Sequence, residues 1–450
     1  MKMKKTIISF FTKNSFYPSP HVATHIKSLV RVAAYIFFSS IMFILFSSCA
    51  FGGSSSSESY NSARDEELLL YGENYRRELE TPVQGRLNGI CYLAMEGVDN
   101  GIDYEKAYQL TYNLGVTSMR QWMHFGYFMS DPDTFKEAET ALMHELIAEG
   151  QAYGLFMIGM SHQNWSVRSK KFVVGKTDRG SSIYREWLET YERTWYNVVK
   201  EFPEIEYWEI DNEVNNPDFM YPEDRSGEAW STEEMAAVTA DMHFYASRGI
   251  HRANPDAVTV LGGIVDPMGL GIPHPETGTT MVNFMEALYD AIESGEHGSY
   301  YPDDFFQTAA WHPYYYKGQA DEYFIAQNDL IYEVIRRREG KDKKVYLTEF
   351  GWQETVYPME NIVSGIGNLF RTIAEQMPYV ESLMYFRMFD NVADNMNIAG
   401  IFYDPNPERE DIIDGVRRCP GAPKPAAYAF QQACGGIGDL ELLKDERQEK

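Results

Sequence analysis

Cysteine and positive charge are both scarce in this sequence of 450 residues. Its four cysteines are too few for a disulfide scaffold or for a cysteine-rich zinc module. The 40 lysines and arginines are outnumbered by 66 aspartates and glutamates, which gives a formal net charge of −26. A field of that sign repels nucleic acids and anionic lipids, so we expect no nucleic-acid partner and no binding to a charged membrane surface.

The sequence also lacks the motifs of several large enzyme classes. It contains no glycine-rich phosphate loop, no nucleophile elbow and no cluster of histidines and carboxylates at metal-ligand spacing. His243 and His251 lie eight residues apart on one expected helix, without the carboxylate motif of a zinc site. We therefore expect no metal ion and no cofactor, and nothing in the sequence predicts a protein partner.

The N-terminal region differs in composition from the rest of the chain. Residues 1–48 contain six basic residues and no acidic residue, and residues 32–46 form an uncharged, mostly apolar run. That run is typical of a signal-peptide core and short for a membrane span. The stretch Phe46-Ser47-Ser48-Cys49 resembles the end of a bacterial lipoprotein signal, with Cys49 as the lipidated residue. An ordinary signal peptide or an uncleaved anchor is the alternative. We expect an exported protein that meets the membrane of the bacterial cell envelope, at the outer membrane or cell surface, only through this lipid.

The remaining chain divides into a linker, one domain and a tail. Residues 49–81 include a Gly/Ser stretch and are expected to form a flexible linker. Residues 82–436 show no linker-like break and are assigned to a single domain, and residues 437–450 form a charged tail. Cys91 lies in an expected buried strand, whereas Cys419 and Cys434 could pair in an oxidising compartment.

Short apolar strands alternate with amphipathic helices throughout this domain. The expected strands are residues 87–93, 118–123, 155–160, 206–210, 258–262, 306–311, 344–350 and 382–386. The expected helices are residues 104–114, 138–153, 184–201, 235–253, 282–294, 320–338, 361–376 and 426–433. This alternation predicts a (β/α)8 barrel of the α/β class. A doubly wound open sheet is the alternative, but the chain lacks the Gly-rich turn that such sheets normally carry after the first strand.

Two of the expected strands lead into glutamates. Glu213 follows the fourth strand, and Glu349 lies at the end of the seventh. Because the carboxyl ends of barrel strands meet at one mouth, we expect these two carboxylates to face each other. Such a pair can hydrolyse a glycosidic bond, since one carboxyl protonates the leaving oxygen while the other attacks the anomeric carbon or activates water. A carboxylate at a strand end can also simply cap the following helix.

These motifs resemble the retaining glycoside hydrolases of clan A, over about residues 85–434. The string Leu347-Thr348-Glu349-Phe350-Gly351-Trp352 is closest to family 39 and its relatives, and family 5 is the other possibility. The resemblance implies that Glu213 is the acid/base and Glu349 the nucleophile, with carboxyls about 5–5.5 Å apart. It also implies that Asn212 binds a sugar hydroxyl, that Arg120 supports the nucleophile, and that His312 and Tyr314 form a His-x-Tyr pattern whose tyrosine bonds to the nucleophile.

Further residues near the expected mouth are candidates for sugar contact, because sugar rings stack on aromatic faces and histidines donate hydrogen bonds. They are Trp165, Trp352, His124 and His162. For the two histidines a structural role remains equally open.

Two positions depart from the pattern of these families. Asp211 stands where relatives often have tryptophan; it could act on Glu213 or be bound by a neighbour. Arg387 stands at the end of the eighth strand, where an aromatic residue is usual. Phe386 or Phe389 could supply that aromatic platform, and Arg387 could meet an acidic sugar or pair with Asp390.

Three functions therefore remain open. The first is a retaining glycoside hydrolase, and the long loops at 214–232 and 266–280 favour a polysaccharide or oligosaccharide substrate. The second is a surface glycan-binding lipoprotein on an inactive barrel. The third is a different barrel enzyme, such as a metal-dependent lyase or isomerase.

Overall fold

The structure is a computed structural model. It describes residues 87–92, 94–99, 101–161, 179–217, 219–220, 230–315, 320–391, 398–406, 412–413, 416–417 and 419–444. The chain divides into two compact units, Met1–Asp65 and Glu66–Lys450, and all described residues belong to the second. The expected signal peptide with Cys49 and the expected linker lie outside the described residues, so these boundaries stay predictions.

A closed barrel of parallel strands forms the centre of the second unit, in the order β1-β10-β9-β8-β7-β6-β5-β2. Its strands are β1 (Leu87–Tyr92), β2 (Ser118–Trp122), β5 (Phe156–Ser161), β6 (Tyr207–Asn212), β7 (Val258–Val265), β8 (Ala309–His312), β9 (Val345–Phe350) and β10 (Val380–Tyr385). Because β1 pairs with both β2 and β10, the sheet has no free edge. The predicted (β/α)8 barrel is confirmed, and the open doubly wound sheet is excluded.

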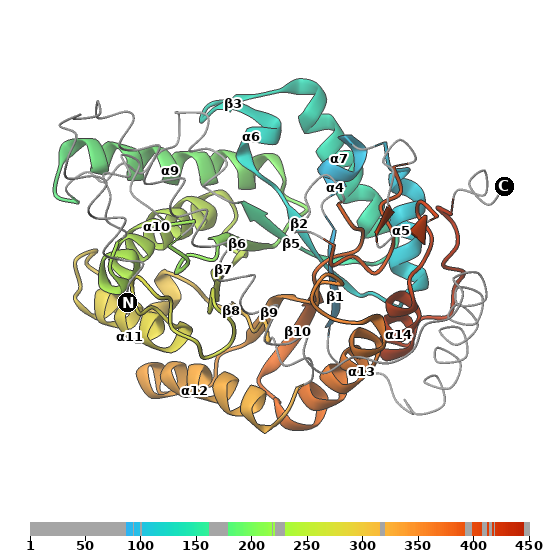
Figure 1. Cartoon of the computed structure of the whole chain (residues 1–450). Coiled ribbons are helices and arrows are strands. Elements are labelled where there is room, and N and C mark those ends of the chain that lie inside the picture. Colours follow the sequence, from blue (N-terminus) through green and yellow to red (C-terminus); the bar gives the residue numbers. More distant parts are fainter. Residues whose placement is uncertain are drawn as a thin grey trace, which may run out of the picture. The chain divides into compact units, whose positions relative to one another are not determined.

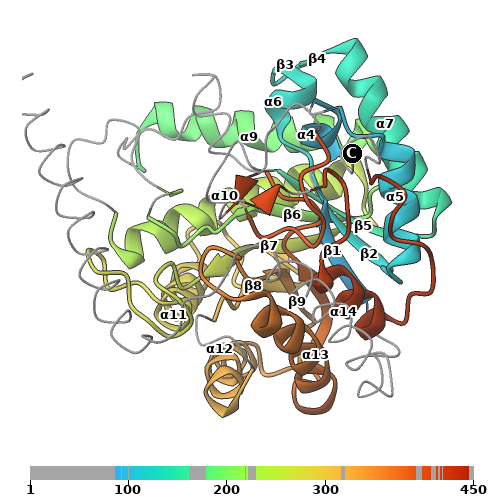
Figure 2. The ribbon, with the colours of Figure 1, turned by 45° about the vertical axis from the view of Figure 1, so that its right-hand side comes forward.

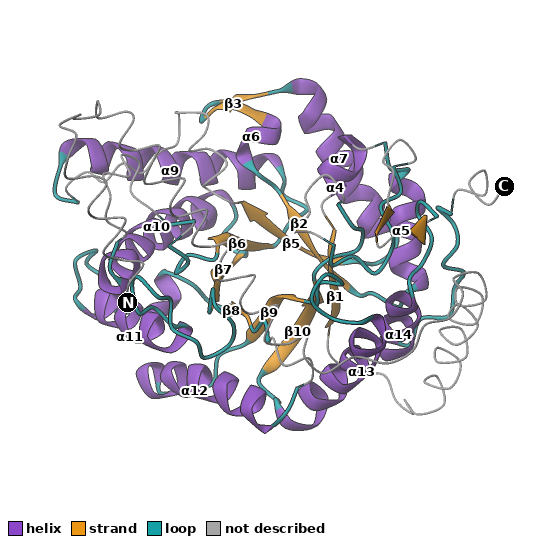
Figure 3. Cartoon of the chain, viewed as in Figure 1, coloured by secondary structure: helices purple, strands orange, loops and turns teal. Residues whose placement is uncertain are grey.

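Helices surround the strands, as Figures 1 and 2 show. They are α5 (Tyr104–Asn113), α7 (Glu137–Ala152), α9 (Ser182–Glu201), α10 (Thr232–Ala253), α11 (Met281–Glu293), α12 (Glu322–Glu339), α13 (Met359–Gln376) and α14 (Pro425–Cys434). Figure 3 shows the resulting division into a central layer of strands and an outer layer of helices. All eight expected helices are present with similar bounds.

Apolar spacing explains which face each helix buries. In α13, Ile362, Ile366, Leu369 and Ile373 are buried at alternating intervals of four and three residues, which places them on one side of the helix. Side chains that point into the barrel form a second, smaller core. It consists of Cys91, Ile158, Val260, Ala310, Tyr346 and Met384, each from a different strand. The barrel interior is therefore packed with side chains below its mouth, as is usual for this fold.

Polar residues fix where several helices begin. Ser231 and Glu234 form a reciprocal capping box at the start of α10, and Thr280 and Asn283 do the same for α11. Helix α12 ends at Gly340, whose φ of 66° lies in the left-handed region that favours glycine. These caps fix where the helices begin and end.

The structure also contains short elements that the sequence pattern did not predict. Two short helices, α4 (Ala94–Asp99) and α6 (Phe125–Phe128), follow β1 and β2. Strands β3 (Met129–Asp131) and β4 (Thr134–Phe135) form a separate hairpin, as do β11 (Ile412–Ile413) and β12 (Val416–Arg417). A 3-10 turn, η2 (Pro302–Asp304), precedes β8, which therefore begins later than expected.

Two expectations about the rest of the chain can be compared with the described residues. None of the described helices is both long enough and apolar enough to cross a membrane.

Cys91 and Cys434 are buried free thiols, and burial raises the pKa of each above its usual value. The possible pairing of Cys419 with Cys434 is therefore not formed.

Trp208 provides a test of the core between β6 and α9. Its ring is fully buried, meets Trp195 edge-on at 5.9 Å, and donates from Nε1 to the Ile205 carbonyl at 3.0 Å. We expect Trp208→Ala to lower the free energy of unfolding by about 3–5 kcal/mol, because it leaves a large cavity. Trp187→Ala, on the half-buried face of α9, is the matched control and should cost clearly less. Urea unfolding of both variants measures the difference, and equal losses would contradict this packing.

Candidate active site

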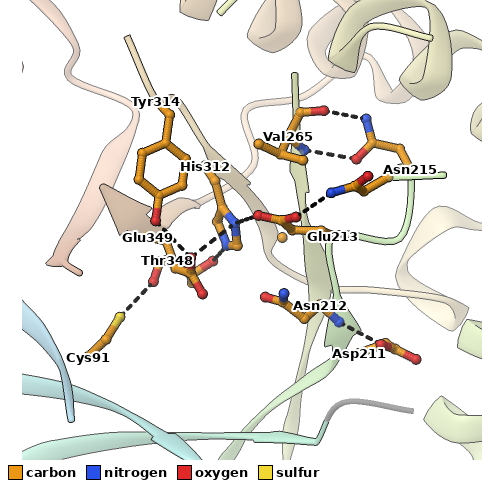
Figure 4. Close-up of polar contacts among 12 residues, drawn as sticks. Cys91, Asp211, Asn212, Glu213, Asn215, Val265, His312, Tyr314, Thr348 and Glu349 are labelled. Carbon is orange, nitrogen blue, oxygen red and sulfur yellow. Dashed lines mark hydrogen bonds and ion pairs between the residues drawn. The ribbon is translucent and has the colours of Figure 1, made fainter. Parts of the chain in front are cut away.

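The two glutamates singled out from the sequence lie together at the carboxyl end of the barrel. Glu213 directly follows β6, and Glu349 lies in β9. Both are buried, with relative exposures of 9% and 5%. Figure 4 shows their side chains on either side of His312, which comes from the end of β8. Strands that are far apart in the sequence thus bring both carboxylates to one place.

A fully buried arginine links the strands beneath this pair. Arg120, from β2, donates from Nε to Glu209 Oε2 at 2.6 Å and from an outer nitrogen to Glu209 Oε1 at 2.9 Å. The same outer nitrogen donates to Asn212 Oδ1 at 2.7 Å, and the other one donates to Glu349 Oε1. Burial alone would lower the pKa of Arg120, but Glu209 and Glu349 raise it above its usual value. Arg120 is therefore a permanent cation shared by two carboxylates.

Glu349 is held by donors on both of its oxygens. Oε1 accepts from Arg120, and Oε2 accepts from the Tyr314 hydroxyl at 2.9 Å. Burial raises the pKa of Tyr314 well above its usual value, and the nearby Glu349 and Glu213 raise it further, so the phenol keeps its proton. Two donors, one of them charged, therefore point at this carboxyl group. This is the environment that a carboxylate nucleophile requires.

Glu213 has different partners. Oε1 lies 3.2 Å from His312 Nδ1, and Oε2 accepts from Asn216 Nδ2 at 2.7 Å. No cation is in direct contact with this carboxyl among the described residues other than His312, which is charged only when protonated. The two glutamates therefore lie close together but contact different groups.

The backbone at the end of β6 is unusual. Asp211 has a φ of 71° and Glu213 a φ of 48°, both in the left-handed region that non-glycine residues rarely adopt. Asp211 Oδ1 accepts the backbone N–H of Asn212 at 2.8 Å, and Figure 4 shows its carboxylate pointing away from Glu213. The extra acid at this position is thus bound to its neighbour's backbone. Such backbone conformations cluster at functional sites.

Contacts at Nε2, the ring nitrogen that does not face Glu213, also hold His312 in place. Its Nε2 lies 3.1 Å from Thr348 Oγ1, and Thr348 donates to Glu209 Oε1 at 3.1 Å. Gly263, on β7, lies against the ring, and a Cβ atom there would come within 2.2 Å of His312 Nε2. Glycine is therefore required at this position for His312 to approach Glu213.

A pocket of about 360 Å³ opens beside Glu213. Its aromatic walls are Tyr314, Tyr315, Trp352, Tyr357 and Phe386, and its other lining residues include Asn216, Asp266, Pro267 and Val356. The pocket is thus mostly apolar, with a few polar groups gathered near the carboxylates, as is usual for small-molecule sites.

One arrangement in the site could also hold a metal ion. Glu213, His312 and Glu349 each offer a ligand atom, and these three atoms lie within 4.8 Å of one another. Two carboxylates and an imidazole are ligands that zinc accepts. The sequence alone predicted no metal, because these residues are far apart along the chain.

The structure brings most of the expected site residues together. Arg120, Asn212, His312 and Tyr314 join the two glutamates through the contacts above, and Trp352 lines the pocket. His124 is buried against the rings of Trp122 and Tyr127, each at 5.1 Å, and is not among the pocket-lining residues. His162 and Trp165 lie outside the described residues. The substrate-binding roles of these residues remain predictions.

The structure also shows the contacts of the residues that follow β10. Phe386 lines the pocket, and the guanidinium of Arg387 lies 5.8 Å from its ring centre. Asp390 accepts from the fully buried Lys424 at 2.6 Å, and Lys424 also contacts Glu354. Burial raises the pKa of Asp390 to about 6, although Lys424 opposes the shift. This cluster ties together the loops that follow β9 and β10, at the back of the pocket.

Three residues of the site were missed in the sequence. Glu209 lies in the middle of β6 and binds Arg120, Thr348 links Glu209 to His312, and Asn216 binds Glu213. Glu209 had a detectable signal, because an ionisable residue inside an apolar strand needs a buried partner of opposite charge. Thr348 and Asn216 carried no comparable signal.

Comparisons with known proteins support the fold. No protein-family model and no curated protein matches the sequence. A family 39 glycoside hydrolase from the gut symbiont Bacteroides cellulosilyticus WH2 has a similar structure, with a TM-score of 0.50 and 16% identity over 79% of this chain and 64% of that chain. The match thus spans less than two thirds of that relative.

Two other solved structures are similar. A GH5_18 protein from Bifidobacterium longum subsp. infantis has a TM-score of 0.50 and 14% identity, covering 79% of each chain. The virulence factor SghA from Agrobacterium tumefaciens has a TM-score of 0.54 and 11% identity, covering 81% of this chain and 99% of that chain. At these identities the likeness shows a barrel fold shared with glycoside hydrolases.

Asp266, in the pocket wall, generates a prediction about stability. Its carboxylate accepts the backbone N–H groups of Gly271 at 2.5 Å and Met281 at 2.6 Å. Burial outweighs these bonds and raises its pKa from 3.8 to about 6. The folded state binds this proton more tightly than the unfolded state does. The resulting contribution to the free energy of unfolding is therefore complete below about pH 4 and is lost as pH rises through 6.

Asp266 should therefore lower the free energy of unfolding of the wild type by up to about 3 kcal/mol as pH rises from about 4 to 6. We expect Asp266→Asn to remove this pH-dependent contribution. Urea unfolding at several pH values measures this difference against the wild type. Asp256→Asn, at an exposed position, is the control and should leave the dependence unchanged. A difference between Asp266→Asn and the wild type that does not vary with pH would show that Asp266 does not titrate in this range.

Proposed function

We propose that this protein is a retaining glycoside hydrolase that acts on a polysaccharide or an oligosaccharide. Glu349 is the nucleophile and Glu213 the acid/base. The observation that carries this proposal is that the two carboxylates, at one barrel mouth, bring an oxygen each within 4.8 Å. This upper limit on the oxygen–oxygen distance is compatible with retaining enzymes, whose carboxyls are about 5–5.5 Å apart, and lies below the inverting range of about 6.5–9.5 Å.

The partners of each carboxylate support its role. Arg120 and Tyr314 both donate hydrogen bonds to Glu349, which attacks the anomeric carbon as a carboxylate while the glycosidic bond breaks. Glu213 gives its proton to the leaving oxygen. In the second step Glu213 takes a proton from water, the water oxygen bonds to the anomeric carbon, and Glu349 leaves. The sugar is released with its original configuration.

The surroundings suggest how a sugar is bound. Trp352, Tyr314 and Phe386 offer ring faces to the pyranose, and the amide of Asn212, held by Arg120, can donate to a sugar hydroxyl. No cofactor takes part in this proposal. We also propose that the chain is exported and anchored by lipid on Cys49, which would place the site outside the cytoplasm, where polysaccharides occur.

Substitution of the nucleophile tests the proposal most simply. We expect Glu349→Gln to remove nearly all turnover of polysaccharides and aryl glycosides, because a neutral amide cannot form the glycosyl intermediate. The measurement is product release from a panel of plant and microbial polysaccharides and aryl glycosides. Glu360→Gln, on the exposed first turn of α13, is the matched control and should retain full activity.

The same panel separates the enzyme from a glycan-binding protein on an inactive barrel. Cleavage by the wild type and the control alone supports the enzyme. Binding by all three forms without cleavage by any would favour the glycan-binding protein and would overturn the proposal. Substantial activity in Glu349→Gln would reject the role of Glu349.

The metal-binding geometry of Glu213, His312 and Glu349 calls for a separate test, because it would suit a metal-dependent lyase or isomerase. We expect dialysis against a chelator to leave hydrolysis unchanged. Added Zn²⁺ should inhibit, since it would occupy both carboxylates. Rates measured before and after chelation decide the matter, and activity lost to the chelator and restored by a metal ion would favour the metal-dependent enzyme.

A further inference from the structure

Glu213 begins a short turn that leaves the barrel at the end of β6. The backbone N–H of Asn216 donates to the Glu213 carbonyl at 2.8 Å and closes this turn, with Val214 and Asn215 between them. Glu213 itself has a φ of 48°, in the left-handed region. That conformation costs energy in a residue with a side chain and persists only where the surroundings hold it. The contacts of this turn must therefore hold it in place.

The side chain of Asn215 binds the turn to the neighbouring strand. Its Nδ2 donates to the Val265 carbonyl at 2.7 Å, and its Oδ1 accepts the Val265 N–H at 2.8 Å. Figure 4 shows this pair of bonds beside Glu213. The parallel pairing of β6 with β7 ends at Asn212 and Gly263. Asn215 thus continues the connection between the two strands beyond their last paired residues.

Both bonds lie in the interior of the protein. Asn215 is fully buried, so bulk water does not compete for them. The amide offers a donor and an acceptor at the end of one side chain, and one residue of β7 uses both. An apolar side chain at this position would leave the Val265 N–H and C=O without these partners.

Val214 packs the same turn against β7. It is fully buried, and a Cβ atom on Gly262 would come within 2.9 Å of its Cγ1, so glycine lets the turn lie close to the strand. Apolar contact has no preferred direction, whereas a hydrogen bond does. Val214 therefore brings the turn to β7, and the two bonds of Asn215 set its orientation there.

The orientation of the turn decides where the carboxyl of Glu213 lies. Oε2 accepts from Asn216 Nδ2 at 2.7 Å, and Oε1 lies 3.2 Å from His312 Nδ1. Asn216 belongs to the turn and moves with it, but His312 comes from β8. The carboxyl therefore meets His312 only while the turn keeps its place relative to the barrel.

We propose that Asn215 is a positioning residue for the acid/base: its amide fixes the turn 213–216 to Val265 and so holds the Glu213 carboxyl where it reaches the glycosidic oxygen. This inference rests on the proposed function. Asn215 is not among the residues that line the pocket, so it acts through Glu213. Without its two bonds the turn relaxes, and the carboxyl moves away from the leaving oxygen.

Asn215→Ala tests the inference by removing both bonds. We expect kcat/KM for substrates with a poor leaving group to fall by about 10²-fold, because a displaced acid protonates the leaving oxygen poorly. Aryl glycosides with a strongly activated leaving group need no such proton, so their kcat/KM should change little. Equal losses for both classes of substrate would show a general structural role and would overturn the inference.

Asn113→Ala is the matched control. Asn113 is another buried asparagine, at the end of α5, and its Nδ2 donates to the Asp439 carbonyl at 2.6 Å. We expect this variant to hydrolyse both classes of substrate as the wild type does. A selective loss with poor leaving groups in Asn113→Ala as well would show that the effect does not depend on Asn215 and would contradict the inference.

A double-mutant cycle shows whether Asn215 acts through Glu213. In a Glu213→Ala background, added azide bonds to the anomeric carbon as Glu349 leaves, and it gives a glycosyl azide without help from a base. We expect Asn215→Ala to leave this azide-dependent rate on an activated aryl glycoside unchanged. A clear loss in this background would mean that Asn215 acts on another group and would overturn the inference.

Crystal structures test the position of Glu213 without a substrate. Asn215→Asp keeps the size of the side chain and an acceptor for the Val265 N–H, so it serves if Asn215→Ala does not fold. We expect the Glu213 carboxyl to lie within hydrogen-bond distance of His312 in the wild type and beyond it in either variant. An unmoved Glu213 would overturn the inference. If Glu213 moves as expected but the wild type cleaves nothing in the panel, the proposed function fails and the positioning by Asn215 stands.

Discussion

The site depends on one buried cation. Arg120 is fully enclosed, and a charge in that position is tolerated only when hydrogen-bonded counter-charges compensate it. Glu209 and Glu349 supply that compensation from two different strands. Each of the three positions thus requires the others, because removing one partner leaves an uncompensated charge in the interior. The same contacts also fix the position of Glu349 at this end of the barrel.

A single barrel mouth can then hold two carboxylates with different partners. Glu349 meets a guanidinium and a phenol, both donors, whereas Glu213 meets the imidazole of His312, whose other nitrogen lies against Thr348. The difference is created by groups beneath the carboxylates rather than by the carboxylates themselves. Residues such as Thr348 and Gly263 therefore matter for the chemistry, although neither is placed to touch a substrate. The left-handed backbone conformations of Asp211 and Glu213 accompany the approach of the Glu213 carboxyl to His312.

Much of this arrangement could be predicted from sequence, for physical reasons that differ between elements. Barrel strands are buried on both faces, so β9 reads as an apolar run, and Glu349 at its end stands out. Glu213 stands out likewise after β6. Glu209 also stands out, as an ionisable residue inside an apolar strand, but the sequence does not identify its partner, because Arg120 lies 89 residues away and the pairing appears only after the barrel closes. His124 illustrates the reverse case, since a histidine after a strand can equally well pack against aromatic rings.

The identity of the residue that forms the covalent intermediate is the central claim, and trapping it is the most direct measurement. A 2-deoxy-2-fluoro glycoside of the sugar that the protein cleaves slows the second step, so the glycosyl-enzyme accumulates and can be mapped by mass spectrometry. We expect inactivation together with one added sugar on the peptide that contains Glu349. A sugar on any other residue, or rapid turnover that releases the inverted product, would contradict the account.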